Sequence, residues 1–384
     1  MMLLQPSLPD ENFTRVPRAV YSQPGGESLQ GVNIPPEMIA YVDPHWLSFP
    51  PATPADHLIL GFIYMFIFAA GVFGNGCVVF IFATTKSLRT SSNLFIANLA
   101  ILDLVMMSQL PIFVANSLYQ GQVMGQGGCI VFGLTGAISG MGAAVNNVAI
   151  AYDRYRSIAN PMGGRLPMGK AAIICLLVWL WAMPFSLLPT FEIWNRFNPE
   201  GYLTTCSFDY LTDSQDVRIF TICIFTYAYL IPVLLLILFY SRILGQVREH
   251  QKMLAEQAKK MGVKSLSASQ DEKSAEIQIA KVACSIFFLF LAAWTPYATV
   301  AMLGAFHPNR AVLTPFASMI PAIFCKTIAC VDPWIYAISH PKFREQMSKR
   351  FPWLISEEKP KVKSNNDTAS QSSAATQAAT EATA

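Results

Sequence analysis

Seven long apolar stretches restrict the fold of this chain more than any other feature of its sequence. They cover approximately residues 58–84, 93–118, 129–155, 171–190, 217–244, 277–303 and 311–338. Each is close to the ~20 apolar residues that a helix needs to cross a bilayer. Only 13% of the 384 residues are charged, compared with roughly a quarter in soluble proteins. The sequence therefore predicts an all-α membrane protein built as a seven-transmembrane helix bundle.

The distribution of Lys and Arg predicts the orientation of this bundle. Of the 27 such residues, 21 fall on one side of the expected membrane, five fall on the other, and Lys326 lies inside the last apolar stretch. By the positive-inside rule, we expect an extracellular N-terminus and a cytoplasmic C-terminus. The net charge of +3 follows from this topology, so we expect no binding of nucleic acid.

Four regions follow from these assignments. An extracellular tail at 1–57, which contains a glycosylation sequon at Asn12, precedes the transmembrane bundle at 58–338. A short basic, amphipathic cytoplasmic helix at 339–354 is expected to contact membrane lipid. The tail at 355–384 is rich in Ala, Ser, Thr and Gln, which predicts a disordered segment with hydroxyl groups open to a kinase.

Lys326 lies near the middle of an apolar stretch, with roughly ten residues of helix on either side. An uncompensated lysine at that depth costs about 2.5 to 3.5 kcal/mol. Two arrangements would offset this cost. The ammonium group can pair with a buried carboxylate, or the amine can condense with an aldehyde and become part of a bound ligand.

Other residues of the apolar stretches predict contacts within the bundle. Cys129 and Cys206 both fall on the outer, oxidising side, which favours a disulfide. The third stretch is rich in small residues: Gly133, Gly136, Ala137, Gly140, Gly142, Ala143 and Ala144. Such residues either let helices approach closely or leave room for a ligand. That stretch ends in Asp153-Arg154-Tyr155, where the arginine can pair locally or reach another helix.

Several motifs resemble those of rhodopsin-like G-protein-coupled receptors over about residues 55–350. They are Asp153-Arg154-Tyr155, Trp294-Thr295-Pro296, the Cys129 and Cys206 pair, and Asp332-Pro333-Trp334-Ile335-Tyr336. Lys326, six residues before Asp332, stands where opsins carry their retinal-binding lysine. Further stretches, such as Ser207-Phe208-Asp209-Tyr210-Leu211-Thr212 and Ala337-Ile338-Ser339-His340-Pro341-Lys342, are similar to arthropod visual opsins of the short-wavelength (ultraviolet and blue) group.

The chain also differs from the opsin and receptor patterns at several positions. Position 332 is Asp where most of the receptor superfamily has Asn, and Phe132 stands where vertebrate visual opsins place a counterion glutamate. Gln109 stands where arthropod ultraviolet opsins typically carry a lysine, which favours absorption of blue or longer wavelengths. No carboxylate precedes Asp153 in the third stretch, so the counterion is expected elsewhere.

The resemblance implies a light receptor whose cofactor is retinal, either 11-cis-retinal or a hydroxylated form. Lys326 would hold it as a Schiff base, which absorbs visible light only when protonated and therefore needs an anion. Glu200, six residues before Cys206, matches the counterion position of invertebrate opsins. Glu192 and Asp209 compete with Glu200 for the role of counterion. Asp103 and Asp332 are weaker candidates for that role. Trp294 and Tyr297, beside Pro296, are expected to pack against the ligand, although such aromatics are as often plain core. Phe132 and Gln109 are also expected to bind the cofactor.

On this reading, photoisomerisation to all-trans moves the sixth helix and releases Arg154. Asp153, Arg154, Tyr155, Asp332, Pro333 and Tyr336 then take part in activating a G-protein of the Gq type. Arrestin and a receptor kinase would act at the phosphorylated tail. We expect a photoreceptor plasma membrane protein for vision that is not an enzyme and holds no metal. Two rival readings remain, a retinal photoisomerase and a receptor for a diffusible ligand.

Overall fold

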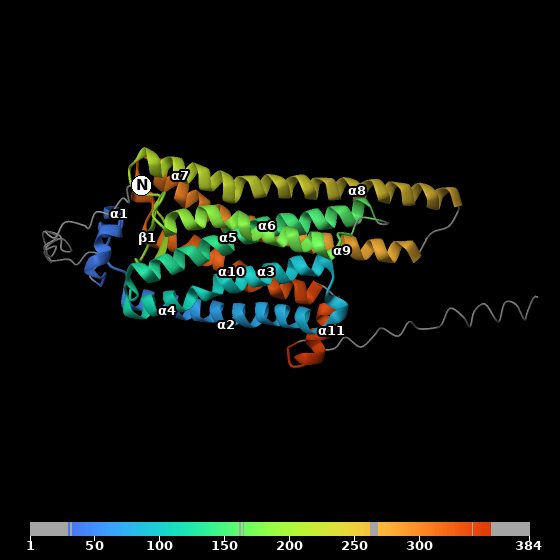
Figure 1. The fold of residues 1–384 in the computed structure, drawn as a ribbon, viewed down its shortest axis with the longest axis horizontal. Coiled ribbons are helices and arrows are strands. Elements are labelled where there is room, and N and C mark those ends of the chain that lie inside the picture. The colour runs from blue at the N-terminus through green and yellow to red at the C-terminus, as the bar shows by residue number, and fades with distance from the viewer. Residues whose placement is uncertain are drawn as a thin grey trace, which may run out of the picture.

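Seven helices are long and apolar enough to cross a membrane within the residues that the computed structural model describes, which are 30, 33–160, 163, 165–261, 268–339 and 341–354. They lie side by side along one direction (Figure 1). In chain order they are α2 (Pro54–Thr84), α3 with α4 (Ser91–Ser108, Leu110–Tyr119), α5 (Gly125–Ala159), α6 (Met168–Thr190), α7 with α8 (Gln215–Phe225, Ile231–Met261), α9 (Ala268–Phe306) and α10 (Pro315–Ser339). The predicted seven-helix bundle is confirmed.

Two of the spans are interrupted. α3 ends at Ser108 and α4 begins at Leu110, with Pro111 in the first turn of α4 and Gln109 between the two helices. A proline cannot donate its backbone nitrogen to the preceding turn, which accounts for the break. In the fifth span, a π-helical turn at Thr226–Leu230 joins α7 to α8. Our sequence reading missed both interruptions.

A β-hairpin closes one end of the bundle, which we call the hairpin end. β1 (Phe197–Glu200) and β2 (Thr205–Phe208) are antiparallel, with Glu200 opposite Thr205 and Pro199 opposite Cys206. The disulfide predicted between Cys129 and Cys206 is present and ties β2 to α5. The all-α prediction did not include this hairpin, because its strands are only four residues long and lack a clear alternation.

Residues before the first span also cover the hairpin end. A 3₁₀ helix at Pro36–Tyr41 and the short helix α1 (Pro44–Leu47) lie there (Figure 1). Met38 and Trp46 are completely buried, and the Nε2 atom of His45 lies 2.7 Å from the carbonyl oxygen of Leu313. Asn12 lies outside the described residues.

The opposite end, which we call the tail end, carries α11 (Pro341–Arg350). This helix corresponds to the predicted amphipathic helix at 339–354, and its Arg350 donates to the hydroxyls of Thr84 and Thr85 at the end of α2. α8 and α9 extend past the bundle at the same end (Figure 1). The tail at 355–384 lies outside the described residues.

Candidate functional site

A cavity lies inside the bundle next to the hairpin. Protein atoms leave about 690 Å³ empty there, a volume that includes space open to solvent. Its walls are mainly apolar and come from α3, α5, α7, α9, α10 and both strands. All six residues predicted to bind the cofactor contribute to this lining: Gln109, Phe132, Glu200, Trp294, Tyr297 and Lys326.

Lys326 reaches the cavity from α10 and is 7% exposed. Its Nζ atom donates to the carbonyl oxygen of Ala322, one turn earlier, at 3.3 Å, and lies 5.1 Å from the ring centroid of Phe132. Among the described residues, no carboxylate oxygen lies within 4 Å of this nitrogen. The first of the two predicted arrangements, a direct ion pair, is therefore not what this structure contains.

Glu200 enters the same cavity from the last position of β1 and is 5% exposed. Its Oε2 atom accepts a hydrogen bond from the Tyr210 hydroxyl at 2.8 Å. Burial raises the pKa of Glu200 to about 7, while the Tyr210 hydrogen bond and the charge of Lys326 act in the opposite direction. Near neutral pH, the Glu200 side chain is therefore present in both its protonated and its charged form.

The competing carboxylates lie elsewhere. Glu192 is exposed and accepts a hydrogen bond from the Tyr41 hydroxyl at 3.3 Å. Asp209 accepts from the backbone nitrogens of Leu211 and Thr212 at 3.0 and 2.9 Å, which stabilises its own turn. Neither lines the cavity.

Asp103 and Asp332 are also absent from the cavity lining. Both are buried, on α3 and α10 respectively, and each has one carboxylate oxygen without a hydrogen-bond partner. Glu200 is thus the carboxylate that this structure places in the cavity with Lys326.

Trp294 and Tyr297 line the cavity from α9, on either side of Pro296. Their rings are 6.1 Å apart in an edge-on arrangement. The Tyr297 hydroxyl forms a hydrogen bond with the Ser207 hydroxyl on β2. The aromatic residues predicted to contact the ligand therefore lie beside the proline of α9 and are also linked to the hairpin.

The small residues of α5 serve both of the predicted purposes. Gly133, Gly136, Ala137 and Gly140 line the cavity, so they leave room for a ligand. A side chain at Gly140 would also collide with the indole of Trp294, and one at Gly142 would collide with Leu102. The stripe of small residues therefore permits close helix contacts along the same face.

The residues predicted for G-protein activation lie toward the tail end. Arg154 pairs with Asp153 at 2.5 Å, and both side chains are buried, at 7% and 1% exposure. The Tyr155 ring lies 6.1 Å from that of Phe239 on α8. Asp332 and Pro333 are buried in α10; the Tyr336 side chain lies outside the described part of the chain. Their roles remain predictions.

The structure adds site residues that our sequence reading did not assign. Tyr210 holds Glu200, Ser207 holds Tyr297, and Phe197 packs directly against Gly133. The register of the hairpin brings these residues to the cavity, and no local sequence signal reveals that register.

Comparisons with known proteins identify the family of this chain. The model of the seven-transmembrane receptor (rhodopsin) family matches residues 74–336. The chain is 51% identical to the blue-sensitive opsin of Apis mellifera over 85% of this chain and 87% of that one. It is 48% identical to the ultraviolet-sensitive opsin of the same species, over 89% and 92%. The crystal structure of squid rhodopsin matches with a TM-score of 0.78 and 34% identity, over 83% and 93%. The chain belongs to the rhodopsin family of seven-transmembrane receptors, among the arthropod visual opsins of the short-wavelength group.

Proposed function

We propose that this light-sensing receptor is a visual pigment that binds 11-cis-retinal through a protonated Schiff base at Lys326, with Glu200 as the counterion. The observation that carries the proposal is the placement of Lys326. Its amine is buried in a mainly apolar cavity, with no carboxylate within 4 Å in the described structure and one buried carboxylate, Glu200, in the same cavity.

The cavity fits this cofactor. Aromatic and small side chains make most of its wall, which suits a long apolar polyene. Retinal, when bound, supplies absorption of light and a change of shape from 11-cis to all-trans. Lys326 provides the point of attachment and Glu200 the negative charge. Tyr210 orients that carboxylate by its hydrogen bond.

The protein can transmit a change at the cavity through α9. Trp294 contacts the cavity two residues before Pro296, where the helix lacks a backbone hydrogen bond and bends easily. α9 continues to the tail end, where the Asp153–Arg154 pair is buried. We propose that movement of α9 releases Arg154 and opens a site for a G-protein of the Gq type.

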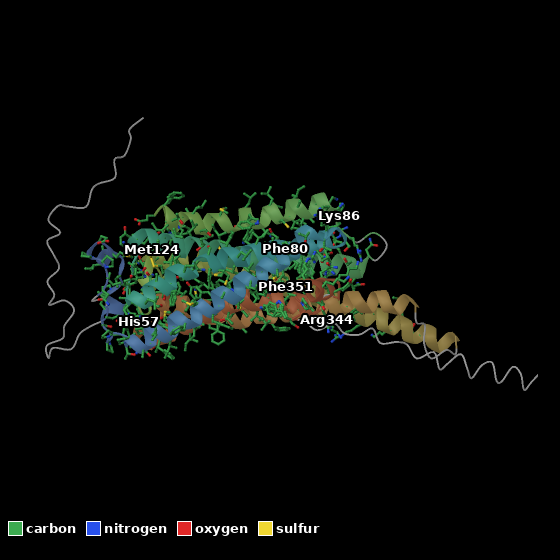
Figure 2. All side chains as sticks on the ribbon, turned by 90° about the horizontal axis from the view of Figure 1, so that it is seen from below. His57, Phe80, Lys86, Met124, Arg344 and Phe351 are labelled. Carbon is green, nitrogen blue, oxygen red and sulfur yellow. A yellow bond between two sulfur atoms is a disulfide. The ribbon has the colours of Figure 1, made fainter. Side chains whose placement is uncertain are left out.

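The orientation and partners follow from the same proposal. Lys86 and Arg344 lie at the tail end, away from His57 and Met124 at the hairpin end (Figure 2). We place the tail end in the cytoplasm of a photoreceptor cell and the hairpin end outside it, by the positive-inside rule. A receptor kinase and arrestin would act on the tail at 355–384, and Asn12 would carry the glycan.

An absorption spectrum tests the proposal. The purified chain is incubated with 11-cis-retinal in the dark, beside Lys326→Ala and Glu200→Gln, and the spectra are repeated after illumination. We expect a visible band in the parent, no such band in Lys326→Ala, and a band moved towards the ultraviolet at neutral pH in Glu200→Gln. A folded parent chain that shows only the free-retinal band would instead favour a receptor for a diffusible ligand.

A second assay separates the pigment from a photoisomerase. Light-dependent nucleotide exchange on a purified Gq-type G-protein is expected from the parent pigment and not from Lys326→Ala. A pigment that isomerises retinal but never stimulates exchange would support the photoisomerase reading.

A further inference from the structure

Two buried amide side chains lie beside the turn of the β-hairpin and take no direct part in the cavity. Asn116 is in the last turns of α4 and Gln122 follows that helix; each is 1% exposed. α4 and β1 lie at the same end of the bundle (Figure 1). We call this pair the amide clamp.

The amide clamp holds three consecutive carbonyl groups of the hairpin. The Nε2 atom of Gln122 donates to the carbonyl oxygens of Leu203 at 3.0 Å and Thr205 at 3.5 Å. The Nδ2 atom of Asn116 donates to the carbonyl oxygen of Thr204 at 3.0 Å. Buried carbonyl groups need such partners, and a buried carbonyl that loses its partner destabilises the fold.

The two amides also fix each other. Asn116 Nδ2 donates to Gln122 Oε1 at 3.1 Å, and Asn116 Oδ1 accepts from the backbone nitrogen of Val123 at 3.0 Å. The donors are therefore oriented before they meet the hairpin.

The turn needs external support because of its backbone. Gly201 has a φ of 62° and Leu203 a φ of 59°. Glycine adopts this left-handed conformation freely, but leucine rarely does. A non-glycine residue keeps such a conformation only where its surroundings hold it, and the clamp binds the Leu203 carbonyl directly.

The position of Glu200 depends on this turn. Glu200 is opposite Thr205 in the hairpin, its carbonyl oxygen accepts from the Leu203 nitrogen at 2.9 Å, and the Thr205 hydroxyl donates to the same oxygen at 3.4 Å. The disulfide anchors the hairpin at Cys206, on the far side of the turn from Glu200.

We propose that Asn116 and Gln122 are positioning residues for the Glu200 carboxylate. They hold the 203–205 segment so that the last residue of β1 presents its charge to the cavity at a fixed distance from Lys326. This inference rests on the proposed role of Glu200 as counterion.

Other groups interact electrostatically with Glu200 and must stay unchanged in a test. Tyr210 donates a hydrogen bond to the carboxylate and Lys326 acts on it through its charge. Glu200 in turn acts on Tyr64, Tyr297 and Cys325. None of the hydrogen bonds of the amide clamp described above involves these side chains. Variants of the clamp therefore change the support of the hairpin and leave these groups in place.

The test is a pH titration of the pigment formed with 11-cis-retinal. Gln122→Met and Asn116→Leu remove the amide groups at similar volume. A carboxylate displaced by 1–2 Å stabilises the protonated Schiff base less, so we expect its proton affinity to fall about five- to tenfold. The visible band should therefore be lost at a lower pH than in the parent. Asn116→Ser keeps a hydroxyl donor in place of the amide and should give a smaller change in the same direction.

Two controls separate positioning from stability. Asn93→Ala removes a buried amide that donates to the Leu88 carbonyl at 2.9 Å, toward the tail end, and should lower the melting temperature without moving the titration. In a Glu200→Gln background, the clamp variants should still lower the melting temperature but cause no further change in the titration.

The outcomes distinguish this inference from the proposal beneath it. If Glu200→Gln alone leaves the titration unchanged, the counterion assignment fails and the inference fails with it. If Glu200→Gln moves the titration but the clamp variants, Asn116→Ser included, titrate like the parent, the inference alone is wrong. A shift that persists undiminished in the Glu200→Gln background also overturns it.

Discussion

Lys326 and Glu200 are two ionisable side chains that share one cavity without a direct ion pair. A buried pair in contact would stabilise both charges and leave the amine blocked. In the proposed pigment, this separation would leave the lysine nitrogen open to an aldehyde, and the carboxylate of the same cavity would act on the product. This arrangement is suited to a site that acquires its permanent charge pair only when the cofactor is attached.

The protonation of Glu200 makes the stability of the ligand-free protein depend on pH. Its pKa is about 7 in the folded protein, against an ordinary value of 4.5, so the folded state holds more protons between these values. The free energy of unfolding therefore falls as pH rises through this window, by up to about 3 kcal/mol. Melting temperatures of the ligand-free protein from pH 4.5 to 8 measure the fall, and Glu200→Gln should lose this contribution.

A companion variant checks the direction of this effect. The Tyr210 hydrogen bond lowers the pKa of Glu200, so Tyr210→Phe should raise that pKa and extend the fall in stability to higher pH. If the melting temperatures of the parent, Tyr210→Phe and Glu200→Gln change with pH in the same way, a group other than Glu200 causes the pH dependence of stability.

At the scale of elements, the sequence was informative where one physical signal dominated. Apolar stretches located the spans because hydrocarbon excludes charge. The six residues predicted to bind the cofactor all line one cavity, and their role in binding remains a prediction. The sequence was uninformative where tertiary contacts decide which residues meet. Nothing local shows that Tyr210 meets Glu200, because that depends on hairpin register. Pro111 was a visible signal for the break between α3 and α4 that we overlooked.

The contact between α5 and α9 gives a prediction for one element against another. A methyl group added at Gly140 would collide with the Trp294 indole, whereas one at Gly127 in the same helix meets nothing within 4 Å. Gly140→Ala should therefore destabilise the protein by about 1–3 kcal/mol and move the absorption band of the pigment. Gly127→Ala should be neutral or stabilising by up to about 1 kcal/mol. Thermal melting and a dark spectrum measure both; equal behaviour of the two variants would contradict the proposed contact.

Across the whole molecule, the cavity and the G-protein residues lie toward opposite ends of the same helices. α5 lines the cavity with Phe132 and Gly140 and carries Asp153 and Arg154 more than three turns further on. α9 lines the cavity with Trp294 and extends beyond the bundle at the tail end (Figure 1). Two continuous helices therefore span the distance between the proposed light-sensitive site and the proposed signalling site, which is the arrangement that a two-state switch requires.

A change to the buried Asp153–Arg154 pair can shift this switch towards its active state without light. Asp153 is 1% exposed and holds the arginine at 2.5 Å, so Asp153→Asn leaves Arg154 with a weaker partner and favours its release. We expect several-fold more nucleotide exchange on the G-protein in the dark, with the absorption spectrum unchanged because the cavity is untouched. Glu345→Gln is the matched control, since it breaks the exposed Lys349–Glu345 pair on α11, and exposed pairs contribute about 0–1 kcal/mol. Dark exchange that rises equally in both variants would mean that general loss of charge, and not release of Arg154, activates the receptor; dark exchange at the parental level in Asp153→Asn would show that this pair does not hold the inactive state.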